Sequence, residues 1–350
     1  MNDMTQTRIL FLDHHSDLHK RVVEVDWRLE NPYHISMQTA AAGGPPDAES
    51  VGRYLDPAVI ADFCGRCDDH YHGRMGRAVV VVFNGAEMTP APYCSRLVRG
   101  VKDKGCRIAL TIRMARRRVF WERVAEYIDF VTLAVPETAA GLDGLLKLAD
   151  YLGRSVTLRL DVNVRPDNVE QAKYAGETIM RSLPDAVVRF VPEMSALPDA
   201  EAERFFRRFE ELQTRAYTHN EANDAHKRWY RGALIGYGAD GAAAVLTPEE
   251  LLAMNANRFK SWLCWSGVER LFVAPDGDVY RAGCGNERLG TVGGTVVFPS
   301  VPVSCPHAVC RDVRDIPVKR QRAVTFRIEQ IPELTAMGAF SHIAENKMSL

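Results

Sequence analysis

The sequence predicts an α/β protein in which six strand–helix units precede a small, cysteine-rich α+β module. Strongly apolar segments such as 78–83 (AVVVVF) are typical of strands that are buried on both faces of a parallel sheet. Segments of helical length follow these strands at regular intervals, which is the alternation of βα folds. Further along, four of the eight cysteines lie between residues 264 and 310 around a hairpin signal, and this grouping predicts a separate module.

The strand–helix units carry local start and stop signals. Asp56 and Pro57 are typical of a helix N-cap and first turn, and Gly105 and Gly153 are typical of helix ends. The expected strands are 22–29, 78–83, 107–112, 128–135, 156–162 and 187–191. The expected helices are 56–67, 93–104, 116–127, 138–152, 168–183 and 199–212. Repeated units of this kind fit either a parallel barrel or an open, doubly wound sheet.

The chain is expected to divide after the sixth unit. Residues 213–236 are polar and contain several His and Asn residues, which indicates a linker. Thr247, Pro248 and Glu250 then form the pattern of a capping box, so a helix should begin here and lead toward Cys264. The predicted organisation is a barrel domain over 1–212, the linker over 213–236, the module over 237–323 and a tail over 324–350.

Charge and composition give no indication of a nucleic-acid partner, a membrane partner or a membrane span. The formal net charge is −1 at pH 7, so no nucleic-acid or anionic-membrane partner is implied, although residues 113–118 (RMARRR) are a local basic cluster. No apolar run approaches the roughly 20 residues that cross a bilayer. The first residues lack the apolar core of a secretory signal, so a cytoplasmic location with reduced cysteines is expected.

The cysteines of the predicted module are spaced as a candidate metal site. Cys264 and Cys284 flank two short β-prone runs joined by PDGD at 275–278, a sequence that suits a tight turn. Cys305 and Cys310 lie on a loop that contains Pro306. Four converging thiolates would suit an iron–sulfur cluster or zinc. The alternative is four reduced and partly buried cysteines.

Two other segments have metal-ligand composition. Cys64 and Cys67 have the spacing of half a zinc knuckle, but they fall on a predicted helix, where cysteines three residues apart more often pack against a sheet. Residues 13–19 (DHHSDLH) contain three histidines, and near a terminus solvated histidines are the expected interpretation.

Local motifs resemble the radical S-adenosylmethionine (SAM) superfamily. Residues 25–31 (VDWRLEN) are similar to the first strand of those enzymes, and 83–90 (FNGAEMTP) resembles their glycine-glycine-glutamate-proline loop. The cysteines, the hairpin and the step at Leu289 and Gly290 resemble the auxiliary-cluster modules called SPASM or twitch domains. The resemblance covers roughly residues 22–318, and it implies a partial (β/α)6 barrel of the TIM type.

The resemblance also implies a cofactor site at the mouth of the barrel. In the family, the backbone and the acidic residue of the second-strand loop hold the amino group of SAM, which corresponds here to Asn84, Gly85 and Glu87. Arg113 and Asn163 follow the third and fifth strands and are expected to line the same mouth, with solvated loop positions as the alternative.

The sequence departs from the family at the catalytic cluster. Family members bind this cluster with three cysteines after the first strand, whereas residues 31–40 contain no cysteine. By the spacing of the family, Tyr33, Met37 and Ala40 stand where the three cysteines would be. Ala86 and Met88 replace the usual glycine and proline of the SAM loop. In the family, the three cysteines leave one iron of the cluster open to bind SAM. Without that iron, SAM binding should be weak and reductive SAM cleavage is not expected.

These observations predict a degenerate radical SAM-like protein that retains an auxiliary iron–sulfur cluster at Cys264, Cys284, Cys305 and Cys310. It would recognise a peptide, sugar or small-metabolite substrate, or assist its modification beside an active partner enzyme. One alternative is an enzyme that uses the barrel mouth for cluster-independent chemistry. The other is an interaction protein in which zinc replaces the cluster.

Overall fold

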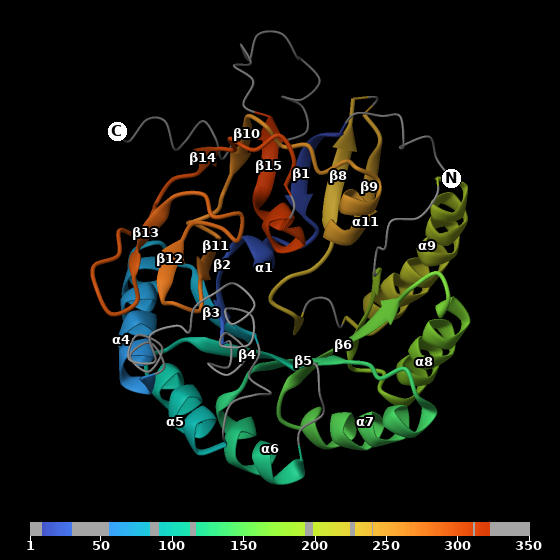
Figure 1. Ribbon diagram of the computed structural model, residues 1–350, viewed down its shortest axis with the longest axis horizontal. Helices are drawn as coiled ribbons and strands as arrows, with labels where there is room; N and C mark the ends of the chain where they lie inside the picture. Colours follow the sequence, from blue (N-terminus) through green and yellow to red (C-terminus); the bar gives the residue numbers. More distant parts are fainter. Residues whose placement is uncertain are drawn as a thin grey trace, which may run out of the picture.

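Two β-sheets form the scaffold of the protein, and segments from both ends of the chain build each of them (Figure 1). The structure is a computed structural model, and it describes residues 9–29, 56–84, 91–112, 117–192, 199–224, 228–239, 241–310 and 312–322. No helix among these residues is long and apolar enough to cross a membrane.

The larger sheet has nine strands in the order β13-β12-β11-β2-β3-β4-β5-β6-β7. Its central strands are parallel and follow the chain: β2 (Val22–Arg28), β3 (Ala78–Asn84), β4 (Arg107–Ile112), β5 (Phe130–Ala134), β6 (Thr157–Val164) and β7 (Val187–Pro192). These are the six strands that the apolar runs predict. The described strands form no closed barrel, because β13 and β7 are the two edges of an open sheet.

Helices cover the outer side of this sheet in Figure 1. They are α4 (Pro57–Asp68), α5 (Ala91–Lys102), α6 (Arg118–Val124), α7 (Ala139–Leu152), α8 (Val169–Ser182) and α9 (Asp199–Ala222), with a π-helix over Asp69–Arg74 and a 3-10 helix over Ala125–Tyr127. The Asp56 side chain accepts a hydrogen bond from the amide of Ala58, which confirms the predicted N-cap of α4. Helix α9 continues to Ala222, well past its predicted end at Leu212, so it occupies part of the expected linker.

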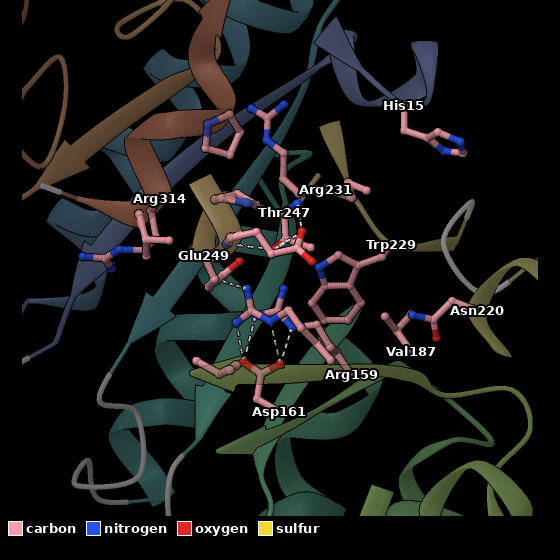
Figure 2. Close-up of a pocket in the computed structure, with 18 of the residues that line it drawn as sticks. His15, Arg159, Asp161, Val187, Asn220, Trp229, Arg231, Thr247, Glu249 and Arg314 are labelled. Carbon is pink, nitrogen blue, oxygen red and sulfur yellow. Dashed lines mark hydrogen bonds and ion pairs between the residues drawn. The ribbon is translucent and has the colours of Figure 1, made fainter. Parts of the chain in front are cut away.

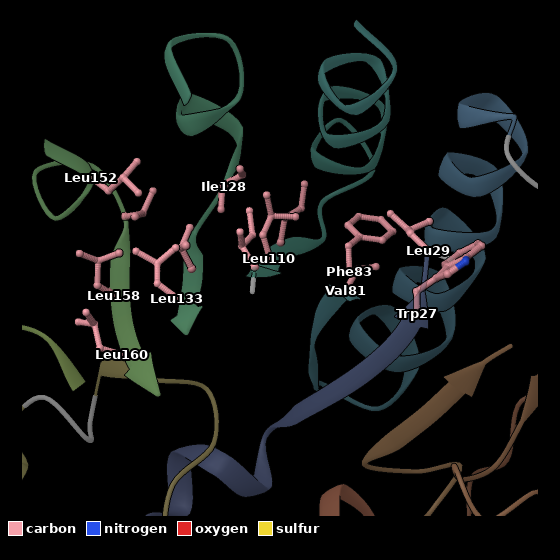
Figure 3. Packing of buried hydrophobic residues seen from close by; sticks show 14 of the residues in the cluster. Trp27, Leu29, Val81, Phe83, Leu110, Ile128, Leu133, Leu152, Leu158 and Leu160 are labelled. Carbon is pink, nitrogen blue, oxygen red and sulfur yellow. The ribbon is translucent and has the colours of Figure 1, made fainter. Parts of the chain in front are cut away.

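The main hydrophobic core lies between the parallel sheet and these helices. Side chains such as those of Phe83, Leu110 and Leu160 are almost completely buried in it (Figure 3). Packing is close enough that a Cβ atom on Gly176 of α8 would overlap the ring of Phe190 on β7. The pleat of each strand sends alternate side chains outward to the helices, and the inner face carries a smaller apolar cluster that includes Val82, Phe130 and Val187.

The carboxyl-terminal segment extends the parallel sheet. Strand β11 (Arg270–Val273) pairs in parallel with β2, and β12 (Asp278–Tyr280) and β13 (Arg288–Thr291) follow as antiparallel strands. The turn between β11 and β12 contains Gly277 at a φ of +85°, a conformation that favours glycine. The hairpin predicted from the PDGD sequence is confirmed.

The second sheet has six strands in the order β14-β10-β15-β1-β8-β9. Its strands are β1 (Ile9–His14), β8 (Leu234–Gly238), β9 (Ala243–Leu246), β10 (Trp262–Cys264), β14 (Val303–Ser304) and β15 (Lys319–Arg322). Strand β1 pairs antiparallel with both β8 and β15, so the start of the chain lies among strands of the predicted carboxyl-terminal module (Figure 1).

Three short helices connect the second sheet to its surroundings. They are α1 (Asp17–Lys20), α11 (Pro248–Ala253) and a 3-10 helix, η4 (Val313–Val318). At the start of α11, the Thr247 side chain accepts from the amide of Glu250, and the Glu250 side chain accepts from the amide of Thr247. This is the predicted capping box, although α11 ends earlier than the sequence pattern suggests.

Candidate functional site

A cavity of about 740 Å³ lies at the carboxyl ends of the parallel strands. Strand residues Asp26, Asn84, Thr111, Asp161 and Val191 form its floor, and residues of α9, α11 and η4 complete its walls. Binding sites of parallel α/β sheets collect at this edge. The cavity is therefore the candidate site that the fold itself indicates.

Strand β6 supplies charged residues to the floor of the cavity because apolar and polar side chains alternate along it. Leu158, Leu160 and Val162 are buried against the helices, whereas Arg159 and Asp161 lie between them on the inner face and line the cavity. Because side chains of a strand alternate between faces, the sequence TLRLDVNV predisposes one face to be apolar and the other polar.

A chain of ion pairs runs across this floor (Figure 2). Arg159 Nε lies 3.0 Å from Asp161 Oδ1, and Arg189 Nη2 lies 2.6 Å from Asp161 Oδ2. Arg189 Nη1 continues the chain to Glu249 Oε1, 2.8 Å away on α11. Burial alone would raise the pKa of Asp161, but the charges of Arg159 and Arg189 outweigh it and hold this pKa below its usual value.

A second group of charges surrounds Asp26, which is fully buried on β2. Arg314 Nη1 lies 2.8 Å from Asp26 Oδ2, Arg270 also pairs with this carboxylate, and Asn84 Nδ2 donates to its other oxygen. Arg270 Nη1 additionally lies 3.3 Å from Asp315 Oδ1 on η4. The Asp26 carboxylate is thus held by groups from β3, β11 and η4 together.

Of the residues predicted to hold a cofactor, the structure brings Asn84 to the cavity floor. Asn163 lies on β6 beyond Asp161 and outside the cavity lining, where its carbonyl accepts from Asn168 Nδ2 at 3.4 Å. Gly85, Glu87 and Arg113 lie outside the described residues, as does the loop 31–40.

Several cavity residues were not predicted from the sequence: Arg159, Asp161, Arg189, Gln213, Trp229 and Glu249. The alternation in β6 was a usable signal for Arg159 and Asp161. The Val-Arg-Phe-Val run of β7 is too short to say which face is inward. Trp229 and Glu249 reach the cavity from segments after the parallel strands, so no local pattern could place them there.

Trp229 closes one side of the cavity over the inner face of the sheet. Its ring contacts Phe130 with centroids 5.3 Å apart, and the guanidinium of Arg159 lies 4.8 Å from its centroid. The indole is only 2% exposed, and Tyr230 packs beside it. Figure 2 shows the Trp229 ring beside Arg159 and above the ion-pair chain. This aromatic group therefore fixes the Arg159 side chain that bonds Asp161.

The cysteines of the predicted metal site lie around a buried lysine. Lys319 Nζ lies 2.9 Å from Cys264 Sγ and 3.5 Å from Cys305 Sγ, and all three residues are at most 3% exposed. Burial raises the pKa of Cys310 to about 12, and burial also raises the pKa of the half-buried Cys284. The thiol donors suit a soft metal, yet no group of three or more His, Cys, Asp or Glu among the described residues is arranged to hold a metal ion.

Cys64 and Cys67 pack in the main core. Both lie on α4 and are fully buried, and burial raises the pKa of each thiol well above its ordinary value. Cys106 Sγ donates to the Cys64 carbonyl at 3.4 Å. These contacts agree with the packing interpretation of the Cys-x2-Cys spacing.

Comparisons with known proteins give only distant likenesses. No family model matches the chain, and no curated protein matches it either. Among solved structures, the chain is similar to SuiB of Streptococcus suis, both bound to S-adenosylmethionine (12% identity, TM-score 0.40) and in a second structure (13%, TM-score 0.41). These matches cover 77% and 78% of this chain but only 63% and 64% of the SuiB chains.

A second likeness is to the 3-dehydroquinate dehydratase of Aquifex aeolicus, at 12% identity and a TM-score of 0.30. That match covers 55% of this chain and 75% of the dehydratase. All of these TM-scores lie below 0.5, and no residue role or activity follows from them.

Proposed function

We propose that the protein recognises a small molecule or short peptide in the cavity at the carboxyl ends of its parallel strands, as a radical SAM-like protein without the catalytic cluster of that superfamily. The observation that carries this proposal is the cavity itself. A volume of about 740 Å³ suits a small ligand, and paired charged side chains converge on it from β2, β6, β7 and α11. The radical SAM part of the proposal rests on the sequence motifs.

The proposed role is recognition of a substrate for modification, beside an active partner enzyme. Residues 31–40 contain no cysteine to bind a catalytic cluster, so SAM would lack the iron that anchors it. We therefore expect the cavity, rather than a cofactor, to provide the specific contacts. The substrate classes that fit its size are peptides, sugars and small metabolites.

Ligand-induced stabilisation tests the proposal. A ligand at a hundred times its Kd should raise the free energy of unfolding by about 2.7 kcal/mol. Val245, which lines the cavity and is 40% exposed, can be replaced by Trp to obstruct it. Val297, which is 71% exposed and lies outside the cavity lining, provides the matched control. Ligands should stabilise the wild type and V297W but not V245W, and equal stabilisation of all three would contradict the proposal.

An auxiliary iron–sulfur cluster at Cys264, Cys284, Cys305 and Cys310 is a further part of the proposal, with zinc as the alternative metal. Its support is the approach of Cys264 and Cys305 to one buried lysine. With a cluster bound, Cys264 and Cys305 would be thiolates, and their sulfurs would accept hydrogen bonds from Lys319 Nζ. Iron, sulfide and zinc analysis of protein purified without oxygen, with C264S as the comparison, tests it. Protein that contains neither metal under these conditions would contradict it.

The second candidate function is cluster-independent catalysis in the same cavity. His15 and Tyr217 favour it, because both line the cavity and His15 Nε2 lies 3.3 Å from the Tyr217 hydroxyl. A histidine beside a hydroxyl can transfer protons near neutral pH. Conversion of a bound ligand by the wild type but not by H15N, followed by mass spectrometry, would support catalysis. Unchanged conversion by H15N would exclude this role for His15.

A further inference from the structure

Lys319 and Cys264 face each other across two neighbouring strands of the second sheet, β15 and β10 (Figure 1). The antiparallel register places Lys319 directly opposite Cys264. Residues in such a pair send their side chains to the same face of the sheet. Lys319 Nζ lies 2.9 Å from Cys264 Sγ. The contact between the amine and the sulfur therefore follows from the backbone pairing as well as from the side-chain positions.

Cys305 brings a second sulfur to the same amine. It directly follows β14, and its amide donates to the Trp262 carbonyl, so it lies diagonally across from Cys264. Its Sγ lies 3.5 Å from Lys319 Nζ. Diagonal neighbours have Cα atoms about 7–8 Å apart, whereas disulfides join Cα atoms that are usually less than about 7 Å apart. The geometry therefore favours a reaction of Cys264 with the amine over a disulfide with Cys305.

The amine of Lys319 is buried without a carboxylate partner among the described residues. Lys319 is 1% exposed, and Cys264 and Cys305 are 2% and 3% exposed. Both hydrogen bonds of Nζ in this part of the chain go to sulfur. A lysine is almost never fully buried unless it is paired, because a buried charge is costly. A reaction that removes the charge of this amine would therefore be favoured by its surroundings.

We propose that O2 joins Lys319 Nζ to Cys264 Sγ through one oxygen atom, which forms an S–O–N bridge between β15 and β10. In the balanced reaction, the thiol, the amine and O2 give the S–O–NH bridge and one water. Sulfur and nitrogen each lose two electrons, and O2 takes up all four. One oxygen atom stays in the bridge, and the other leaves as water with one hydrogen from sulfur and one from nitrogen. The bridge is uncharged.

The measured separation favours this bridge over a direct bond between sulfur and nitrogen. A sulfenamide would require the two atoms to move from 2.9 Å to bonding distance. An inserted oxygen bonds both atoms close to their present positions. Burial also favours O2 as the oxidant, because it is small and apolar and can enter through local opening of the fold.

The bridge would connect the oxidation state of the protein to its cavity. Lys319 directly follows η4, and Arg314 and Pro317 of η4 line the cavity. A bond from Lys319 to β10 would anchor this wall. The bridge would also remove Cys264 from the proposed metal site, so bridge and cluster exclude each other. The inference goes beyond the proposed function and requires neither a ligand nor a metal.

Peptide mass spectrometry tests the proposal on the full chain. One sample is purified in air with EDTA and a second without oxygen, and iron and zinc are measured in both. Each sample is alkylated without reductant and digested with trypsin. A bridge blocks cleavage at Lys319 and links residues 261–270 to residues 315–320. The linked pair should be about 14 Da heavier than the two peptides together, because one oxygen is gained and two hydrogens are lost.

The linked pair should be at least tenfold more abundant in air than without oxygen, and reduction of the isolated pair should release both unmodified peptides. Oxygenation under 18O2 should place the heavy isotope in the bridge. Absence of the pair in air, with or without bound metal, would overturn the inference. A link that contains no oxygen atom, or an oxidised Cys264 without a link, would also overturn it. The metal content of the same samples tests the cluster separately.

Variants assign the two bridged atoms. K319R keeps a cation but removes the amine, and C264S removes the sulfur, so both should lose the linked pair. C305S should keep it, because Cys264 is the nearer sulfur. K147M, at an exposed position of α7, is the matched control for K319R and should also keep it. Retention of the pair in C264S would contradict the assignment. The wild-type samples decide the proposal even where a variant fails to fold.

Discussion

Arg189 on β7 and Glu249 at the start of α11 are joined by an ion pair in which Arg189 Nη1 lies 2.8 Å from Glu249 Oε1. Because Arg189 also holds Asp161 on β6, one side chain connects the floor of the cavity to its opposite wall. Desolvation opposes the charge of Arg189, but Asp161 and Glu249 outweigh it and raise its pKa. A partly buried charge network therefore joins the floor of the cavity to its wall, beside the apolar side chains of Val82, Val187 and Trp229.

Replacing Arg189 with Met should destabilise the fold. The substitution leaves Asp161 and Glu249 as poorly compensated carboxylates, at a cost of about 3 kcal/mol. Urea denaturation should show a lower midpoint with an unchanged slope. Arg154→Ala is the control, because Arg154 and its partner Asp150 are both mostly exposed, and its effect should stay within about 0.5 kcal/mol. Equal stabilities of R189M and the wild type would contradict the network.

Stability should fall as the pH drops below about 6.5, because His14 is only 3% exposed and not solvated as the sequence predicted. Burial, and then the charge of Arg320, lowers the pKa of this histidine to about 3, while its hydrogen bond to Glu269 acts in the opposite direction. Below pH 6.5 the unfolded chain takes up a proton at His14 that the folded chain refuses until about pH 3. The loss between pH 7 and pH 5 should be about 2 kcal/mol.

Denaturation curves at several pH values measure this dependence. His14→Gln should remove most of the slope between pH 7 and pH 5, even if it lowers stability at every pH. His72→Gln, at an exposed position, is the control and should leave the slope unchanged. A wild-type slope that survives in H14Q would assign the acid sensitivity to other groups.

Gly176 and Gly144 should respond oppositely to the same substitution. A Cβ atom on Gly176 would overlap the Phe190 ring, so Gly176→Ala should destabilise by about 1–3 kcal/mol. Gly144 lies in α7 with nothing within 4 Å of the added atom, so Gly144→Ala should stabilise by about 0.5–1 kcal/mol. Thermal denaturation of both variants checks this, and a shift of the same sign in both would contradict the described packing.

SAM should bind weakly and should not be cleaved. The loop 31–40 has no thiolate to hold an iron atom that SAM could chelate. Calorimetry should therefore give little heat with SAM, and incubation with SAM and dithionite should give no 5'-deoxyadenosine. Measurable 5'-deoxyadenosine would overturn the proposal that the catalytic cluster is lost. Tight SAM binding that Glu87→Ala abolishes would instead indicate a retained cofactor role.

The parallel sheet could be predicted because its information is local. Each of β2 to β7 is a β-prone segment of strand length, continuously apolar in β3 and alternating in β6, and turn or capping residues delimit the helices between them. The second sheet could not be predicted in the same way. Strand β1 pairs with β8 and β15, which are more than 200 residues away in the chain, and its segment (ILFLDH) carries no sign of those partners.

The candidate site shows the same difference between local and long-range information. Asn84 was expected at the mouth because it follows the predicted strand 78–83 in a loop that resembles the SAM-holding loop of the radical SAM superfamily. Its bond to Asp26 joins the adjacent strands β2 and β3. The contact between Arg189 and Glu249 joins residues 60 positions apart and exists only once α11 is folded over the sheet. Likewise, the cysteine spacing indicated a cluster but gave no reason to expect Lys319 beside two of the sulfurs.

A crystal structure of the protein soaked with a sugar, N-acetylglucosamine, or with a short peptide derivative, N-acetylalanine amide, tests the central claim most directly. The account predicts ligand density in the cavity at the carboxyl ends of β2, β3, β6 and β7. The ion pair between Arg189 and Asp161 should still be intact in the ligand-bound structure. Ordered water throughout the cavity, with both probes bound only elsewhere, would contradict the account.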